Sequence, residues 1–213
     1  MGTHETNLNT QEWAVRHPLQ HNFTHVYYTD GSRIETQDQA EVPEYHTGVG
    51  LYFKNLTQEH MAMFKFETDQ PILDAELTGL WKAVKVPPQS GEVHRHIYTD
   101  CLSALYLLQR ALTSPLTLKH HAYEAPVRSI LRDAANVKTI TGKRMMVHFH
   151  KVKAHSGIEG NEIADRIAKF ACTQEDERTP IPCISVTGIL VIKAHDFRLS
   201  RGARTWRVFV NLK

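Results

Sequence analysis

The stretch from residue 25 to residue 32, His-Val-Tyr-Tyr-Thr-Asp-Gly-Ser, constrains the fold of this chain most. Its residues 26–29 are β-branched or aromatic and do not alternate with polar ones, which is typical of a central strand covered on both faces. The strand is expected to end at Asp30, and Gly31 lets backbone come close to whatever Asp30 binds. The same residues also suit an ordinary turn, so the role of Asp30 depends on carboxylates elsewhere in the chain.

The remaining pattern predicts an α/β domain with a mixed sheet. Residues 33–46 read as a polar surface loop, and two strands follow it with a hairpin-length connection, so the first three strands should form an antiparallel meander. The second half alternates helices and strands, which implies parallel neighbours. Its expected elements are a helix at 74–84, a strand at 92–99, helices at 102–112 and about 121–136, a strand at 145–152, and a helix through 163–171.

Three further carboxylates occupy comparable positions in other predicted elements. Asp100 follows its strand as Asp30 does, at the end where open α/β sheets form their sites. Glu76 is expected in the first turn of a helix capped by Asp74, a position that also favours a carboxylate through the helix dipole. Asp165 lies near the start of the last helix. If these groups converge they repel, and cations are needed to keep them ionised together.

Carboxylate oxygens in this number suit Mg²⁺ or Mn²⁺ and do not suit zinc. Two such ions, placed a few ångströms apart, can orient a water molecule for in-line attack on a phosphodiester. His155 lies on a glycine-bearing loop ten residues before Asp165, which makes it a candidate proton carrier or product-releasing group. The pattern therefore favours metal-dependent hydrolysis of a nucleic acid.

Four motifs occur in order within residues 25–172. They are Tyr28-Thr29-Asp30-Gly31-Ser32, Asp74-Ala75-Glu76-Leu77, Tyr98-Thr99-Asp100, and Lys153-Ala154-His155-Ser156-Gly157 with Gly160-Asn161-Glu162-Ile163-Ala164-Asp165. Together they resemble a type I ribonuclease H domain, and the chain is most similar to the domains found at the end of retrotransposon reverse transcriptases. The set is far more specific than any one of its members.

The resemblance implies a ribonuclease H-like fold, in which a five-stranded mixed sheet with its first three strands antiparallel is flanked by helices. It implies an endoribonuclease that cleaves the RNA strand of an RNA/DNA hybrid with two Mg²⁺ ions, for which Mn²⁺ can substitute. A reverse transcriptase or a nucleoprotein assembly is the expected partner. The implied site residues are the metal ligands Asp30, Glu76, Asp100 and Asp165, the auxiliary histidine His155, and Gly31 and Ser32 as substrate contacts.

The chain departs from the family pattern at three places. Cys101 stands where the family often has serine, and residues 71–75 lack the asparagines that some members place before the glutamate. Residues 114–125 contain no counterpart of the basic, tryptophan-bearing insertion of some cellular members. These departures affect contacts with the hybrid more than metal binding.

Domain boundaries are expected to separate a polar leader at 1–22, a ribonuclease H-like domain at 23–174 and a basic tail at 175–213, which includes a strand-like apolar run at 184–192. From residue 178 onward there are seven basic residues and one acidic residue, whereas the rest of the chain has 18 basic and 22 acidic residues. A basic tail beside an acidic body suggests an arm for nucleic acid or is simply solvated.

No apolar run approaches the ~20 residues of a membrane span and no secretory segment is evident, so we expect no membrane partner and a nuclear or cytoplasmic location. The three cysteines show no paired spacing, which does not suggest a disulfide framework or a cysteine zinc site.

Three alternative interpretations stay open. A DDE-type transposase or integrase shares the sheet and the carboxylates, although its last acidic motif differs. A catalytically inactive retroelement-derived domain could serve as a nucleic-acid-binding or structural part of a larger nucleoprotein. The third is a zinc site, although histidines with a period of two on neighbouring strands are also typical of surface pairs. Its ligands would be His94, His96, His148 and His150.

Overall fold

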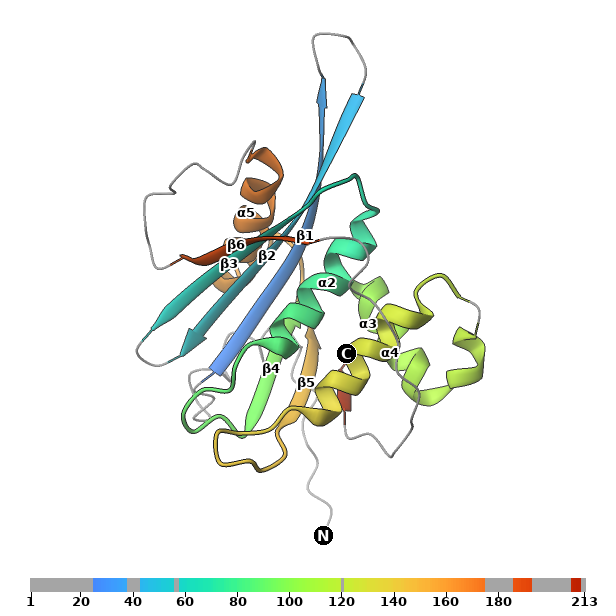
Figure 1. Ribbon diagram of the computed structural model, residues 1–213, viewed down its shortest axis with the longest axis vertical. Helices are drawn as coiled ribbons and strands as arrows, with labels where there is room; N and C mark the ends of the chain where they lie inside the picture. The colour runs from blue at the N-terminus through green and yellow to red at the C-terminus, as the bar shows by residue number, and fades with distance from the viewer. Residues whose placement is uncertain are drawn as a thin grey trace.

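A mixed β-sheet forms the centre of the molecule (Figure 1). The computed structural model describes residues 25–37, 43–55, 58–119 and 121–174, together with the backbone of 186–192 and 208–211. The central strand order is β3-β2-β1-β4-β5, in which β1 to β3 are antiparallel neighbours and β4 runs parallel to both β1 and β5. These strands are β1 (His25–Gln37), β2 (Pro43–Asn55), β3 (Glu59–Phe66), β4 (His94–Thr99) and β5 (Met146–Lys151).

The expected five-stranded mixed sheet with an antiparallel first half is therefore confirmed. Two more strands flank it: β6 (Val186–Ile192) pairs parallel with β3, and β7 (Val208–Asn211) pairs parallel with β5. Both belong to the segment that the sequence assigns to a basic tail, and the apolar run at 184–192 was expected to be strand-like. The rest of that segment and the polar leader at 1–22 lie outside the described residues.

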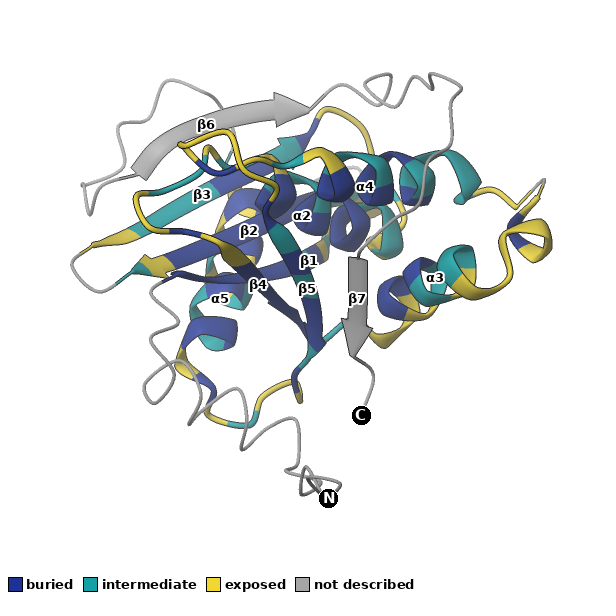
Figure 2. Cartoon of the chain, turned by 90° about the horizontal axis from the view of Figure 1, so that it is seen from below, coloured by how far each residue is buried: buried dark blue, intermediate teal, exposed yellow. Residues whose placement is uncertain are grey.

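Helices cover both faces of the sheet, and Figure 2 separates the layers, with α5 on one side and α2 and α4 on the other. The larger apolar core joins α2, α3 and α4 to the face that carries Tyr27, Ile97 and Phe149. A smaller core joins α5 to the face that carries Tyr28 and Tyr98. The helical elements are α2 (Ile72–Lys85), α3 (Leu102–Thr113), the 3₁₀ turn η1 (Pro115–Leu118), α4 (Glu124–Asn136) and α5 (Glu159–Thr173).

Strand β1 does not end at Asp30, and the prediction of a loop over residues 33–46 is wrong for most of that range. β1 and β2 continue as a long hairpin whose last pair is Gln37 with Pro43. Its polar composition is compatible with a strand because cross-strand contacts stabilise it. The guanidinium of Arg33 lies 4.0 Å from the centre of the Tyr45 ring and forms a 2.7 Å ion pair with Asp69.

Helix α2 begins at Ile72, two residues before Asp74, which was the expected N-cap. Pro71 occupies the N-cap position, and its carbonyl accepts the backbone N–H of Asp74 at 2.9 Å. Asp74 therefore lies in the first turn, as a carboxylate that favours the helix dipole. Glu76 consequently lies in the second turn, deeper along the sheet than the sequence predicted.

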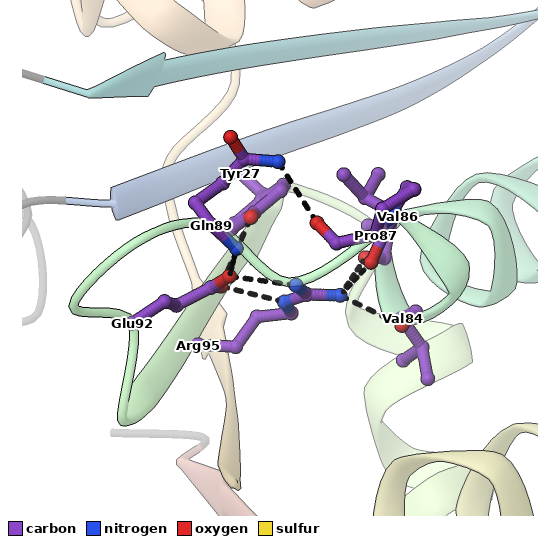
Figure 3. Close-up of polar contacts among 8 residues, drawn as sticks. Tyr27, Val84, Val86, Pro87, Gln89, Glu92 and Arg95 are labelled. Atoms are coloured by element: carbon purple, nitrogen blue, oxygen red, sulfur yellow. Dashed lines mark hydrogen bonds and ion pairs between the residues drawn. The ribbon is translucent and has the colours of Figure 1, made fainter. Parts of the chain in front are cut away.

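A buried ion pair ties β4 to the end of α2 (Figure 3). Arg95 is fully buried, and its guanidinium donates two hydrogen bonds to the buried Glu92 carboxylate at 2.7 and 2.8 Å. Its Nη1 also donates to three carbonyl oxygens at the end of α2, including that of Val84 at 2.8 Å. The hydroxyl of Tyr27 on β1 donates to the same carboxylate at 2.9 Å. Nearly every polar atom of the pair is thus engaged, which offsets the desolvation of both charges.

The described residues contain no helix that is both long and apolar enough to cross a bilayer.

Removing the guanidinium should strongly destabilise the protein. Arg95→Met leaves the Glu92 carboxylate buried without its charge partner, and breaking such a pair costs about 3–5 kcal/mol. We expect the free energy of unfolding in urea to fall by about that amount. The matched control is Arg128→Met, because Arg128 pairs with Glu124 on the partly exposed surface of α4 and such pairs contribute less than about 1 kcal/mol. Similar small losses in both variants would contradict a stabilising role for Arg95.

Candidate active site

The register of the two central parallel strands brings two carboxylates together. Tyr28 of β1 pairs with Tyr98 of β4, and each is followed two residues later by an aspartate, Asp30 or Asp100. The parallel pairing stops at these tyrosines, while β1 continues in antiparallel pairing with β2, so that Asp30 lies opposite Gly50. The sheet therefore opens beside Asp30, at the carboxyl end of β4.

Helix α2 adds the third carboxylate. A Cβ atom on Gly31 would lie 2.9 Å from Cβ of Ala75 and 3.0 Å from the backbone nitrogen of Glu76, so only glycine allows α2 to approach β1 this closely. One ligand oxygen each from Asp30, Glu76 and Asp100 lies within 4.8 Å of the others. Asp30 and Glu76 are buried, and Asp100 is partly exposed.

Helix α5 brings Asp165 to Asp30 from the other face of the sheet. Gly50 of β2 packs against the α5 backbone, where an added Cβ would lie 2.7 Å from the nitrogen of Ala168. At this close approach the Asp165 carboxylate acts on Asp30 as a like charge and helps to raise its pKa. Asp30 thus lies between Glu76 from one helix layer and Asp165 from the other.

Burial and mutual repulsion change the protonation of this cluster. Burial first, and then the charges of Asp100 and Asp165, raise the pKa of Asp30 to about 8, although the Gly31 N–H donates to its Oδ1 at 2.9 Å. Burial and the charges of Asp30 and Asp100 also raise the pKa of Glu76 well above its ordinary value. A cation bound at this point would offset both the desolvation of the carboxylates and their mutual repulsion, because it compensates the buried negative charge.

The donor set fits a hard divalent cation. All of its ligand atoms are carboxylate oxygens, which Mg²⁺ and Mn²⁺ prefer. In addition, Oε2 of Glu76 is buried and accepts no hydrogen bond from the part of the chain that the structure describes. A buried oxygen of this kind needs a partner, and a metal ion among the three carboxylates would provide it.

The loop that carries His155 lies beside the fourth carboxylate. A ligand atom of His155 lies within 4.8 Å of atoms offered by Glu162 and Asp165. His155 is exposed and adopts a positive φ of 48°, and the neighbouring Gly157, with a φ of 78°, donates its N–H to Glu162 at 3.4 Å. The structure therefore places His155 near Asp165 at the surface, outside the group of the other three carboxylates.

Two polar partners of the cluster were not predicted as site residues, although Asn161 belongs to one of the quoted motifs. The buried Asn161 of α5 donates from Nδ2 to Oδ2 of Asp100 at 3.0 Å, and Lys169 donates to Asp165 at 2.8 Å. The spacing of four residues on one helix could have indicated the Lys169 contact. The Asn161 contact joins residues 61 positions apart, so only the tertiary structure reveals it.

The two predicted substrate contacts lie near α2 and α5. Gly31 faces Ala75 and Glu76, and Ser32 is buried, with its carbonyl oxygen accepting a hydrogen bond from Sγ of Cys172 at 3.3 Å. Their contact with substrate stays a prediction. Cys101, which replaces the family's serine, is neutral at pH 7 because burial and the charge of Glu76 raise the pKa of its thiol to about 12.

Comparison with known proteins identifies relatives of this arrangement. The RNase H family model matches residues 22–173. The fold is similar to that of the PFV RNase H domain in solution, with a TM-score of 0.52 and 18% identity over 70% of this chain and 94% of that chain. LC9-RNase H1, a type 1 RNase H with the type 2 active-site motif, gives a TM-score of 0.47 and 14% identity over 70% of this chain and 72% of that one.

The crystal structure of the prototype foamy virus protease-reverse transcriptase gives a TM-score of 0.45 and 17% identity over 72% of this chain. The matched region makes up only 21% of that protein. No curated protein matches the chain.

Asp30→Asn should stabilise the metal-free protein at alkaline pH. The pKa of Asp30 is about 8 in the folded state and 3.8 in the unfolded chain, so between these values the folded state binds the extra proton. The contribution of this carboxyl group to the free energy of unfolding is therefore most favourable below about pH 4 and is lost as the pH rises to about 8. In chelator, the thermal midpoint of the variant should exceed that of the wild type above pH 8 and match it near pH 4. Asp69→Asn, at an exposed carboxylate whose pKa Arg33 lowers, should show no such gain.

Asn161→Ala should weaken the link between α5 and β4. Loss of a buried hydrogen bond to a carboxylate costs about 1.5–3 kcal/mol, so urea unfolding should show that decrease. The control is Asn136→Ala, because Asn136 donates only to the Arg132 carbonyl at the exposed end of α4. If Asn161→Ala in an Asp100→Ala background costs as much as it does alone, the two side chains are not coupled.

Proposed function

Because the chain belongs to the RNase H family, we propose that it is an endoribonuclease that hydrolyses the RNA strand of RNA/DNA hybrids with the help of divalent metal ions. The observation that carries this proposal is the convergence of Asp30, Glu76 and Asp100 from three separate elements. Such a cluster destabilises a metal-free fold, as the raised pKa values indicate. Its presence is best explained by a cation-dependent activity.

The carboxylates are proposed to hold two Mg²⁺ ions, for which Mn²⁺ can substitute. When bound, these ions supply an activated water and compensate the charge on the leaving oxygen. The chain's own contribution is to position the ligands: β1 and β4 present Asp30 and Asp100, and α2 presents Glu76. Asn161 orients the Asp100 carboxylate through its 3.0 Å hydrogen bond. Asp165 completes the ligand set from α5.

His155 is proposed to carry protons or to help release product. It is exposed, on the glycine-bearing loop next to Asp165, the carboxylate that is proposed to complete the ligand set. In the hydrolysis, water adds to phosphorus and the bond from phosphorus to the 3′ oxygen breaks. The leaving oxygen must gain a proton, which His155 can deliver. The products are a 3′-hydroxyl and a 5′-phosphate.

The retrotransposon-type motifs support placing the domain beside a reverse transcriptase in a retroelement. Seven basic residues from position 178 onward support a further role for the tail in binding the hybrid's phosphates. Gly31 and Ser32 are proposed to contact substrate through the backbone near Asp30.

Cleavage of a labelled RNA/DNA hybrid by the full chain tests the proposal. Wild type should cut the RNA strand only with Mg²⁺ or Mn²⁺, and excess chelator should abolish cutting. Asp30→Asn and Asp100→Asn should retain less than about 1% of the rate, whereas His155→Ala should retain about 1% to 10%, because a general acid or base contributes roughly 10²-fold. Asp69→Asn serves as an exposed-carboxylate control and should cut at the wild-type rate.

The outcomes distinguish the enzyme from the inactive alternative. A folded wild type that binds the hybrid but does not cut it in either metal would support a binding or structural role. Cutting that persists in chelator would contradict the metal mechanism. Equal and complete loss in all three site variants would contradict the separate role of His155.

A further inference from the structure

Four histidines gather on the face of β4 and β5 that carries the Tyr28 and Tyr98 rings. His96 pairs with His148 in the parallel register, and His94 and His150 lie one step away on either side. Ligand nitrogens of His94, His96 and His148 all lie within 4.8 Å of one another. Three imidazoles this close on two neighbouring strands match the number of protein ligands in catalytic zinc sites.

The four rings also lie in one row, in which His148, His96 and His150 are stacked and His94 is tilted against His148. Ring centres of His94 and His148 are 5.3 Å apart, those of His148 and His96 are 4.6 Å apart, and those of His96 and His150 are 5.3 Å apart. Nδ1 of His94 lies 3.1 Å from Nε2 of His148, and Nδ1 of His96 lies 3.0 Å from Nε2 of His150. The histidines are thus held by their neighbours and are not independent surface residues.

His96, His148 and His150 are neutral at pH 7, which is the form that binds metal. Burial, and then the neighbouring histidines, lower the pKa of His148 to about 4 and that of His150 to about 3. Burial and the other three rings lower the pKa of His96 to about 2. Protons therefore do not compete with a metal ion for these nitrogens at neutral pH.

We propose that His94, His96 and His148 form a second metal site, specific for a late first-row divalent ion of the Zn²⁺ type. Three imidazole ligands without a carboxylate suit Zn²⁺, Ni²⁺ or Cu²⁺ and not Mg²⁺. The fourth position would take water, because His94 is exposed. His150 would act as a positioning residue: with His96 bound through Nε2, the Nδ1 contact to His150 orients the ring, as outer partners of metal-bound histidines do.

The present ring arrangement requires one adjustment. The His96 and His148 rings are nearly parallel, 8° apart, and parallel rings cannot aim their lone pairs at one point. A tetrahedral ion with Zn–N bonds of about 2.0–2.1 Å needs ligand nitrogens about 3.4 Å apart, close to the 3.1 Å between His94 and His148. Binding would turn the His148 ring about χ2, out of its parallel stack with His96, and exchange its contact with His94 for a shared bond to the ion.

This site is distinct from the carboxylate cluster. His94 begins β4 and Asp100 follows its end, so six residue steps of about 3.3 Å, or about 20 Å, separate them. The ion would link β4 to β5, two strands that are separated in sequence by the 46 residues between Thr99 and Met146. Because an unfolded chain cannot assemble these ligands, binding should stabilise the fold.

Zinc titration of the full chain, with excess Mg²⁺ present to occupy the carboxylates, tests this proposal at pH 7.5. Calorimetry should detect one tight equivalent of Zn²⁺, accompanied by a rise in the thermal midpoint. His94→Gln and His148→Gln should each weaken that equivalent at least 10-fold. The matched control is His121→Gln, because His121 is also exposed but lies outside the cluster; it should bind zinc as the wild type does.

Ring nitrogen NMR keeps the test independent of variant folding. In the ¹⁵N-labelled wild type, Zn²⁺ should shift the ring nitrogens of His94, His96 and His148, and Co²⁺ should give the strong visible absorption of a four-coordinate site. Hybrid cleavage by His94→Gln should equal that of the wild type. The proposal is wrong if no stoichiometric zinc binds, if the ring signals stay unshifted, or if zinc binding survives unchanged in both cluster variants.

Discussion

The close approach of two helices to the centre of the sheet is the constraint on which the candidate site depends. Gly31 admits the start of α2 and Gly50 admits α5, because a side chain at either position would overlap the helix. The two helices cover opposite faces, so Asp30 lies between Glu76 on one side and Asp165 on the other. A methyl group in either contact would push a helix outward and move its carboxylate with it. The packing of small residues therefore sets the distances between the carboxylates, and with them the electrostatics of the site.

Strand β4 and the residue after it hold polar groups in three different environments within seven residues. At its start Arg95 is neutralised by Glu92 and by the carbonyl oxygens at the end of α2. In its middle His96 stays uncharged in a stack of imidazoles. Directly after its end, Asp100 joins carboxylates that nothing in the described residues neutralises fully. The ion pair stabilises the fold and the histidine rings avoid a buried charge, whereas the carboxylates leave uncompensated negative charge that a cation would balance.

The sequence predicted the fold class well because the periodic patterns and the motifs agree. The sequence predicted strands β1 to β5, with antiparallel neighbours in the first half and parallel neighbours in the second. It also predicted the position of each carboxylate along the chain. It failed at the hairpin beyond Asp30, since polar residues there read as a loop although pairing with β2 and contacts such as Arg33 with Tyr45 stabilise a strand. It also placed Glu76 one turn too early, because an aspartate is a more familiar helix cap than Pro71.

By itself, the sequence determined which residue types are available and which element carries each of them. It provides carboxylates in β1, directly after β4, on α2 and on α5, and a histidine on a glycine-bearing loop. Only the tertiary structure decided which of them meet. It joined Asn161 to Asp100 across 61 residues and placed His155 beside Asp165, away from the other three carboxylates. The physical reason is that local propensity acts over a few residues, whereas register, helix approach and burial, which set distances and pKa values, arise only when the whole sheet has formed.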